Sequence, residues 1–200
     1  AYGAYSQKGA LRGVTSLFAR GTCYLYSDPV KQTHKVTDFD VADFSIGLKE
    51  DLARFYSASL WAEVILKSYA GGEASELLYR ELTRFLSHLE AAHEEEIVRI
   101  SFQFLWRYLG FLGLRPDLTS CEECGRSIGR EEPRYYVSGL PGFVCAGCAA
   151  GDAPTLQPEP SRYLIETQRM PVEQALTVEL GTQARRNLRG ILYGLLEDVL

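Results

Sequence analysis

The sequence predicts an α+β protein: a small antiparallel β module, incomplete at its start, then a helical bundle with an inserted segment of paired cysteines. Three observations predict it. An aromatic-rich stretch contains a central turn, several stretches repeat apolar residues every three or four positions, and two C-x-x-C pairs follow them. We expect the β module to span residues 1–47 and the helical domain 48–200, with the cysteine segment at 117–150.

Length and composition set the class of protein. With 200 residues, of which 46% are apolar and 24% charged, the chain can bury a core and shows no bias toward disorder. No run approaches the roughly 18 apolar residues of a membrane-spanning helix, and residues 1–11 lack a signal-peptide pattern. We therefore expect a cytoplasmic protein that does not associate with membranes. Because the chain does not begin with Met, we also expect sequence to precede Ala1.

Charge is distributed unevenly along the chain. The formal net charge of −5 argues against a surface covered with phosphate-binding cations. Up to Val36, however, Asp28 is the single acidic residue, against Lys8, Arg12, Arg20, Lys31 and Lys35. This end could hold a polyanion, or it could be an ordinary solvated face.

The β module is predicted from residues 14–46. Residues 18–27 are rich in aromatics, and Asp28-Pro29 marks a turn before a second alternating stretch. Tyr24 and Tyr26 share one face of their strand, where they are either stacking platforms for bases or sheet core. Cys23 stands alone, and we expect a small buried apolar residue rather than a nucleophile.

Helical periodicity begins after the β module. Residues 49–70, 73–92 and 94–113 each place apolar side chains on one face, and their short joints predict a bundle. Glu94, Glu95 and Glu96 complement the positive end of a helix dipole, so they indicate a helix start rather than a site. A Pro-rich joint at 153–160 precedes two closing helices, at 161–168 and 182–199.

Four cysteines carry the most specific motif, namely Cys121, Cys124, Cys145 and Cys148. Twenty residues separate the two C-x-x-C pairs, a spacing typical of a four-thiolate zinc site on a hairpin. Disulfides are disfavoured without a secretory signal, and a redox pair is disfavoured because neither pair opens a helix in a βαβ unit. We expect one Zn²⁺ that is structural, because four thiolates leave no open position for substrate.

A zinc deaminase is the enzymatic alternative. His88-Leu-Glu90 followed by Cys121 and Cys124 superficially resembles the H-x-E…C-x-x-C signature. Ser120 stands where that signature has proline, and the second cysteine pair would be unexplained. His34 and His93 lack partners at ligand spacing and are expected at the surface. With no other catalytic motif, we expect a protein that is not an enzyme.

The order of these segments resembles the RecO family of bacterial DNA repair proteins, which are recombination mediators. The likeness is carried by Gly47-Leu-Lys-Glu-Asp-Leu52, Gly113-Leu-Arg-Pro-Asp-Leu118, both cysteine pairs, and Ala184-Arg-Arg-x-Leu-Arg189. Lys8-Gly9-Ala10 and Leu17-Phe18 add to it. The cysteines are the specific motif, and the other segments support it by their order.

The resemblance implies an OB-fold at the N-terminus, here a partial OB-like DNA-binding module. It also implies binding of single- and double-stranded DNA, strand annealing, contact with the acidic C-terminal tail of single-stranded DNA-binding protein, and action with RecR to help load the recombinase RecA. The five N-terminal cations are then the candidate phosphate contacts. Arg185, Arg186 and Arg189 form a second group that also fits an ordinary helix surface.

The tail-binding slot is predicted on the third helix. An acidic peptide with a free carboxylate needs an apolar slot with a cation at its mouth. Arg99 and Arg107 lie eight residues apart near Ile100, Phe104 and Trp106. The alternative is that both arginines pair with Glu95, Glu96 or carboxylates of neighbouring helices.

Two other functions stay open. The first is a protein–protein adaptor in which the zinc site only shapes a docking surface. The second is a GTPase-activating module with a related zinc finger, for which Arg126, Arg130 or Arg134 would supply the arginine finger.

Overall fold

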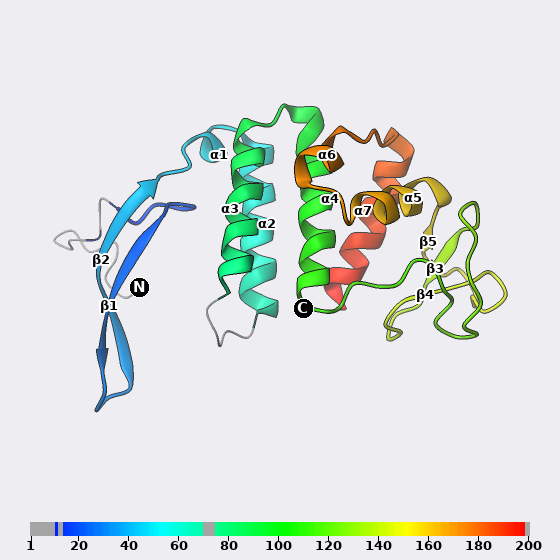
Figure 1. Ribbon diagram of the computed structural model, residues 1–200, viewed down its shortest axis with the longest axis horizontal. Helices are drawn as coiled ribbons and strands as arrows, with labels where there is room; N and C mark the ends of the chain where they lie inside the picture. The colour runs from blue at the N-terminus through cyan, green and yellow to red at the C-terminus, as the bar shows by residue number, and fades with distance from the viewer. Residues whose placement is uncertain (1–10, 12–13, 70–74, 199–200) are drawn as a thin grey trace. The chain divides into compact units, whose positions relative to one another are not determined.

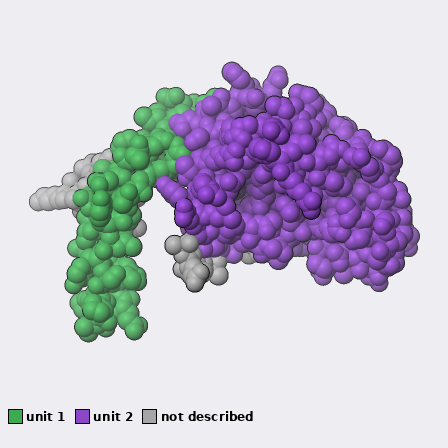
Figure 2. Space-filling view, viewed as in Figure 1, with its two compact units in different colours: residues 1–58 green, residues 59–200 purple. Residues whose placement is uncertain are grey.

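The computed structural model describes residues 11, 14–69 and 75–198. They belong to two compact units, residues 1–58 and 59–200 (Figure 2). No helix in the described ranges is long and apolar enough to span a membrane.

The first unit contains an antiparallel hairpin of β1 (Arg20–Asp28) and β2 (Thr33–Asp43) (Figure 1). The predicted turn is confirmed, because one carboxylate oxygen of Asp28 accepts hydrogen bonds from the backbone N–H groups of Val30 and Lys31. In the described part of this unit the sheet has two strands. The antiparallel module is therefore confirmed, and the OB-like barrel stays a prediction.

Side chains of β1 are exposed on both sides of this hairpin. Cys23 is exposed, so the expectation that it fills a core is wrong. Tyr24 and Tyr26 are 47% and 59% exposed and are not core residues of the described hairpin. The physical reason is that, within residues 14–58 of this unit, the hairpin is a two-stranded ribbon without a second layer over either face.

The first predicted helix is two helices, α1 (Gly47–Glu50) and α2 (Leu52–Ser68). Asp51 separates them with an extended backbone, and its carboxylate accepts a hydrogen bond from the N–H of Arg54. The start of α2 packs on the strand entry, with the rings of Phe18 and Phe55 5.8 Å apart. Lys49 donates to the hydroxyl of Ser16 and so ties α1 to the same segment.

The second unit is organised around α4 (Glu94–Phe111), which contacts α3 (Glu76–Ala91), α6 (Val172–Thr177) and α7 (Thr182–Glu197). The predicted apolar stripe is buried at Ile97, Ile100, Phe104 and Tyr108. Burial also extends to the other faces, at Arg99, Phe102, Gln103, Leu105, Trp106 and Leu109. The helix is therefore the central element of the unit rather than one wall of a bundle.

An aromatic cluster forms the core around α4. Trp61 is fully buried and stacks on Phe104 at 4.4 Å, while Phe85 meets both rings edge-on. The start of α4 matches the prediction for the glutamates: His93 caps the helix and Glu96 bonds back to its backbone N–H.

The closing helices are α5 (Pro158–Thr167) and α7, close to their predicted ranges, and the short α6 between them was not predicted. The predicted hairpin exists as β3 (Arg134–Tyr136) and β4 (Phe143–Val144). A third strand, β5 (Thr155–Leu156), pairs with β3 from within the Pro-rich joint. The side chain of Asn187 on α7 holds β5 by donating to the carbonyl of Thr155 and accepting from the N–H of Gln157.

Candidate functional site

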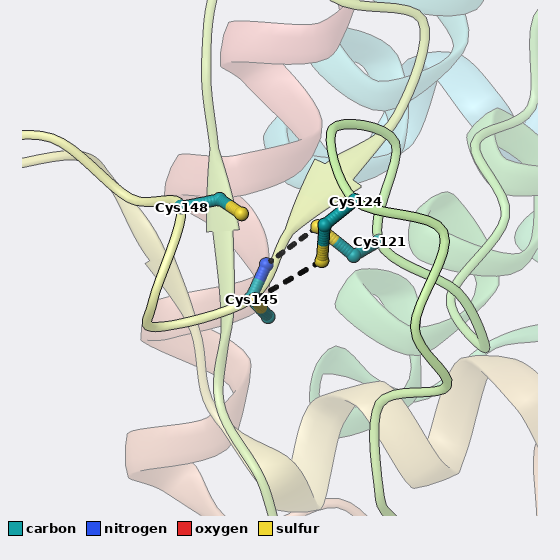
Figure 3. Close-up of side chains that lie close together, drawn as sticks. All are labelled: Cys121, Cys124, Cys145 and Cys148. Carbon is teal, nitrogen blue, oxygen red and sulfur yellow. Dashed lines mark hydrogen bonds between the residues drawn. The ribbon is translucent and has the colours of Figure 1, made fainter.

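The four paired cysteines converge on one point (Figure 3). Their sulfur atoms all lie within 4.8 Å of one another, and the Sγ atoms of Cys124 and Cys145 are 3.9 Å apart. The backbone N–H of Cys145 donates to Cys121 Sγ at 3.3 Å. Cys121 and Cys145 are buried, whereas Cys124 is exposed. The two knuckles therefore present their sulfurs to a shared position.

The donor set fits a tetrahedral metal ion. Zn–S bonds of about 2.3 Å in a tetrahedron separate the sulfurs by about 3.8 Å, close to the observed spacing. All four are free thiols, and at 3.9 Å the sulfurs of Cys124 and Cys145 are too far apart for a disulfide bond of about 2.05 Å. In the described part of the chain the group contains only cysteines, without a histidine or carboxylate. The four cysteines could hold one metal ion, and such a closed site organises the fold.

Neighbouring groups shift the pKa values of two of these thiols in opposite directions. Hydrogen bonding from the guanidinium of Arg126 lowers the pKa of Cys145 to about 6. A hydrogen bond with Cys124 is the main cause that raises the pKa of Cys148 to about 12. Metal ligation requires thiolates, and a divalent cation would offset the repulsion among four of them.

A buried arginine holds the loops of this segment together. Arg134 is 1% exposed and donates to the carbonyl oxygens of Leu118 at 2.6 Å, Glu132 at 2.7 Å and Gly129 at 3.3 Å. Burial lowers its pKa. Arg134 is therefore a structural residue and is not available as an arginine finger, which counts against the GTPase-activating alternative.

The other two arginines considered for that role are also engaged. Arg126 pairs with Glu132 and Arg130 with Glu166. The deaminase alternative fails on similar grounds, because His88 hydrogen bonds with Glu173 and does not join the cysteine group.

A slot of about 260 Å³ lies between α3 and the second half of α4. Its walls are mainly apolar, with Leu78, Phe85 and Phe111 among them, and its charged lining residues are Glu81, Arg107 and Arg115. Arg107 is held in place because its Nη2 donates to the carbonyl oxygens of Thr167 and Met170. The slot thus combines apolar walls with fixed positive charge.

This arrangement corrects the predicted partner site in part. Arg107 lines the slot, but Arg99 is 9% exposed, pairs with Glu179 and does not line it. Ile100 and Trp106 are buried in the core instead of facing a ligand. The reason is the central position of α4, which has other elements on the face that carries Arg99. Arg115 was missed, although Gly113-Leu-Arg-Pro116 signals a chain reversal beside the helix end.

The candidate DNA contacts of the N-terminal part differ in how accessible they are. Lys8 and Arg12 lie outside the described residues. Arg20 pairs with Asp43, while Lys31 and Lys35 are exposed beside the turn of the hairpin. The two strands and their turn also carry carboxylates that oppose a polyanion, at Asp28, Asp38, Asp40 and Asp43.

The C-terminal candidate DNA contacts also differ in how accessible they are. Arg185 is half-buried, and its Nε donates to the carbonyl oxygen of Leu180. Arg186 and Arg189 are exposed and lie on the same side of α7 as Tyr193, which is 41% exposed. Two cations and one aromatic ring on this side remain accessible.

Comparison with known proteins identifies the family. The family model "Recombination protein O C terminal" matches residues 49–200. The chain is 28% identical over 149 residues to the DNA repair protein RecO of Desulforamulus reducens, covering 74% of this chain and 56% of that protein. The chain is also 28% identical over 150 residues to the DNA repair protein RecO of Alkaliphilus metalliredigens, and the match covers 73% of this chain and 60% of that protein. The DNA repair protein RecO of Anaeromyxobacter sp. (strain K) is 32% identical over 112 residues, which cover 54% of this chain and 42% of that protein.

The chain thus spans little more than half the length of the first two relatives. The matched region contains both cysteine pairs, the slot between α3 and α4, and the exposed arginines of α7. Because the family model covers most of the chain, the chain belongs to the RecO family.

Proposed function

We propose that this chain acts in DNA repair as part of a recombination mediator. In this role it binds single- and double-stranded DNA, promotes annealing of complementary strands, and helps load the recombinase together with RecR and single-stranded DNA-binding protein. The observation that carries the proposal is the family match over residues 49–200, among relatives named DNA repair protein RecO. We infer that its metal is one structural Zn²⁺ and that the protein is not an enzyme.

DNA binding would rest on few contacts. Exposed Arg186, Arg189 and Tyr193 provide two cations and a ring on one side of α7, and Lys31 and Lys35 provide two cations beside the hairpin turn. Cations that follow phosphates, together with aromatic platforms, bind single strands without sequence preference. Lys8 and Arg12 would add to the N-terminal group.

The Arg186→Ala/Arg189→Ala double variant is expected to flatten the salt dependence of single-strand binding. Each lost phosphate contact removes roughly 0.7 from the slope of log affinity against log salt, so the pair should remove about 1.4. The measurement is a fluorescence anisotropy titration with labelled poly-dT at several salt concentrations.

The matched control is Arg80→Ala/Arg169→Ala, which removes two other exposed cations. It should leave the salt slope unchanged. Equal slopes in the two double variants would remove α7 from the DNA interface. If Lys8→Glu/Arg12→Glu also changes neither affinity nor slope, the alternative of a zinc-stabilised protein–protein adaptor gains support.

The slot between α3 and α4 would hold the tail of single-stranded DNA-binding protein. An apolar side chain of the peptide would enter among Phe85, Phe104 and Phe111, and its carboxylates would meet Arg107 and Arg115. Charge-assisted hydrogen bonds to arginine suit a free carboxylate. Burial lowers the pKa of the Arg107 guanidinium, and Glu81 across the slot opposes that shift. Both effects are consistent with a partly desolvated cation that gains from an anionic ligand.

The Arg107→Ala variant is expected to weaken binding of an acidic tail peptide by about tenfold or more, because a charge-assisted hydrogen bond of about 1.5 kcal/mol or more is lost. Isothermal titration calorimetry with the peptide measures the change. Arg99→Ala is the control, because Arg99 lies outside the slot.

The same change also removes the bonds from Arg107 to the carbonyls of Thr167 and Met170, so a second variant separates binding from folding. Glu81→Gln removes a negative charge from the slot and should strengthen tail binding about twofold. If neither Arg107→Ala nor Glu81→Gln changes the affinity for the acidic tail peptide, the slot is not its binding site.

A further inference from the structure

A second, larger groove of about 570 Å³ adjoins the cysteine segment. The loop after α4, the first knuckle, the turn between β3 and β4, and the end of α7 form its walls. Leu109, Leu114, Leu140 and Leu195 provide apolar surface. Its volume is that of an ordinary ligand site, with room for a few side chains. The function proposed above does not use it.

The charges of this groove are predominantly negative. Among the described residues that line it, three carry carboxylates, Asp117, Glu122 and Asp198, and one is a cation, Arg115. Asp198 accepts hydrogen bonds from the hydroxyls of Tyr136 and Ser138, and these neutral donors leave its charge in place.

Asp117 is partly compensated, whereas Glu122 is not. Asp117 accepts hydrogen bonds from Thr119 and Ser120, and the charge of buried Arg134 interacts with it. Glu122 is exposed and has no ion-pair partner among the described residues. These carboxylates do not form a metal cluster, since the cysteines are the one such group found in the described ranges.

Arg115 lies between this groove and the slot and lines both. Gly113, with φ of +74°, reverses the chain, and the N–H of Leu114 bonds to the carbonyl of Leu109. Gly110 then leaves space for the guanidinium, because a Cβ there would lie 2.9 Å from Arg115 Nη1. Two glycines thus place one cation on the last turn of α4, beside both cavities.

We propose that the groove binds an extended segment of a partner protein in which lysine or arginine alternates with apolar residues. Basic side chains would approach Glu122 and Asp198, and apolar ones would cover Leu114 and Leu140. Charge complementarity selects this occupant over an acidic one. The charge of Arg115 repels a basic segment in the groove, whereas the same charge attracts the acidic tail in the neighbouring slot.

The test is fluorescence anisotropy with a blocked eight-residue peptide of alternating lysine and leucine, and with its counterpart in which glutamate replaces lysine. The lysine peptide should bind more tightly, and added salt should weaken it. Glu122→Gln should weaken the lysine peptide two- to fivefold, the range for one exposed charge pair. Glu123→Gln is the matched control, because Glu123 is the neighbouring exposed carboxylate and does not line the groove.

Arg115→Ala provides a readout that misfolding cannot imitate. It should strengthen binding of the lysine peptide and weaken binding of the acidic tail peptide. Weaker binding of both peptides would overturn the proposal, as would equal effects of Glu122→Gln and Glu123→Gln. If the lysine peptide responds as expected but the acidic tail does not bind the unaltered chain, the groove stands and the tail slot fails.

Discussion

Replacing Cys145 with serine is expected to abolish zinc retention and to unfold residues 117–150, while α3 and α4 stay folded. The reason is that this segment has little core of its own, formed by Ile128 and Val144 with the buried cysteines. Metal binding in small fingers contributes about 10–16 kcal/mol, and that free energy is also folding free energy. Metal analysis and amide hydrogen exchange at Tyr135 and Val144 measure the two effects.

Cys23→Ser is the control, because Cys23 lies on the exposed hairpin and outside the cysteine group. It should retain one equivalent of zinc. A chelator should reproduce the exchange pattern of Cys145→Ser in the unaltered chain. Less than half an equivalent of zinc in freshly purified, reduced protein would contradict the metal assignment.

Arg134→Met is expected to destabilise the second unit by about 2–5 kcal/mol. The change preserves bulk but removes the guanidinium donors that reach the carbonyls of Leu118, Gly129 and Glu132. The buried carbonyl acceptor of Leu118 would then lose its hydration without compensation, whereas the carbonyl of Gly129 keeps a hydrogen bond from the N–H of Glu132. Urea unfolding followed by tryptophan fluorescence measures the loss, since Trp61 and Trp106 are buried in this unit.

Arg130→Met makes the same chemical change at an exposed arginine of the same loop, whose side chain is 71% exposed. It should cost less than about 1 kcal/mol, because exposed ion pairs contribute little. Equal losses in the two variants would show that Arg134 is not the anchor of this segment.

Local patterns in the sequence predicted the features that depend on local chemistry. The cysteine spacing predicted the convergence of four sulfurs, because each knuckle fixes two of them within a single turn. Periodicity predicted α3 and α4, and the triple glutamate predicted where α4 begins. Arg107 lines an apolar slot, whereas Arg99, predicted beside it, does not, and the binding of a tail peptide there stays a prediction.

Features that depend on distant partners could not be read in this way. The face of α4 that carries Arg99 is covered because α6 and α7 pack on α4. The spacing of residues within α4 does not show which later helices will pack on it. Strand β5 has two residues, too few for any periodicity. The exposure of Cys23 depends on what covers a hairpin, and its own neighbours in sequence do not determine that.

The position of β5 has a consequence for how the chain is made. Both knuckles leave the ribosome before β5, and Asn187, which holds β5, follows some thirty residues later. The cysteines can therefore capture metal during synthesis while β3 still has an unpaired edge, and that edge is covered only when α7 has formed. A nascent chain that stalls between these points would expose the edge of β3 beside the cysteine group, where another chain could pair with it.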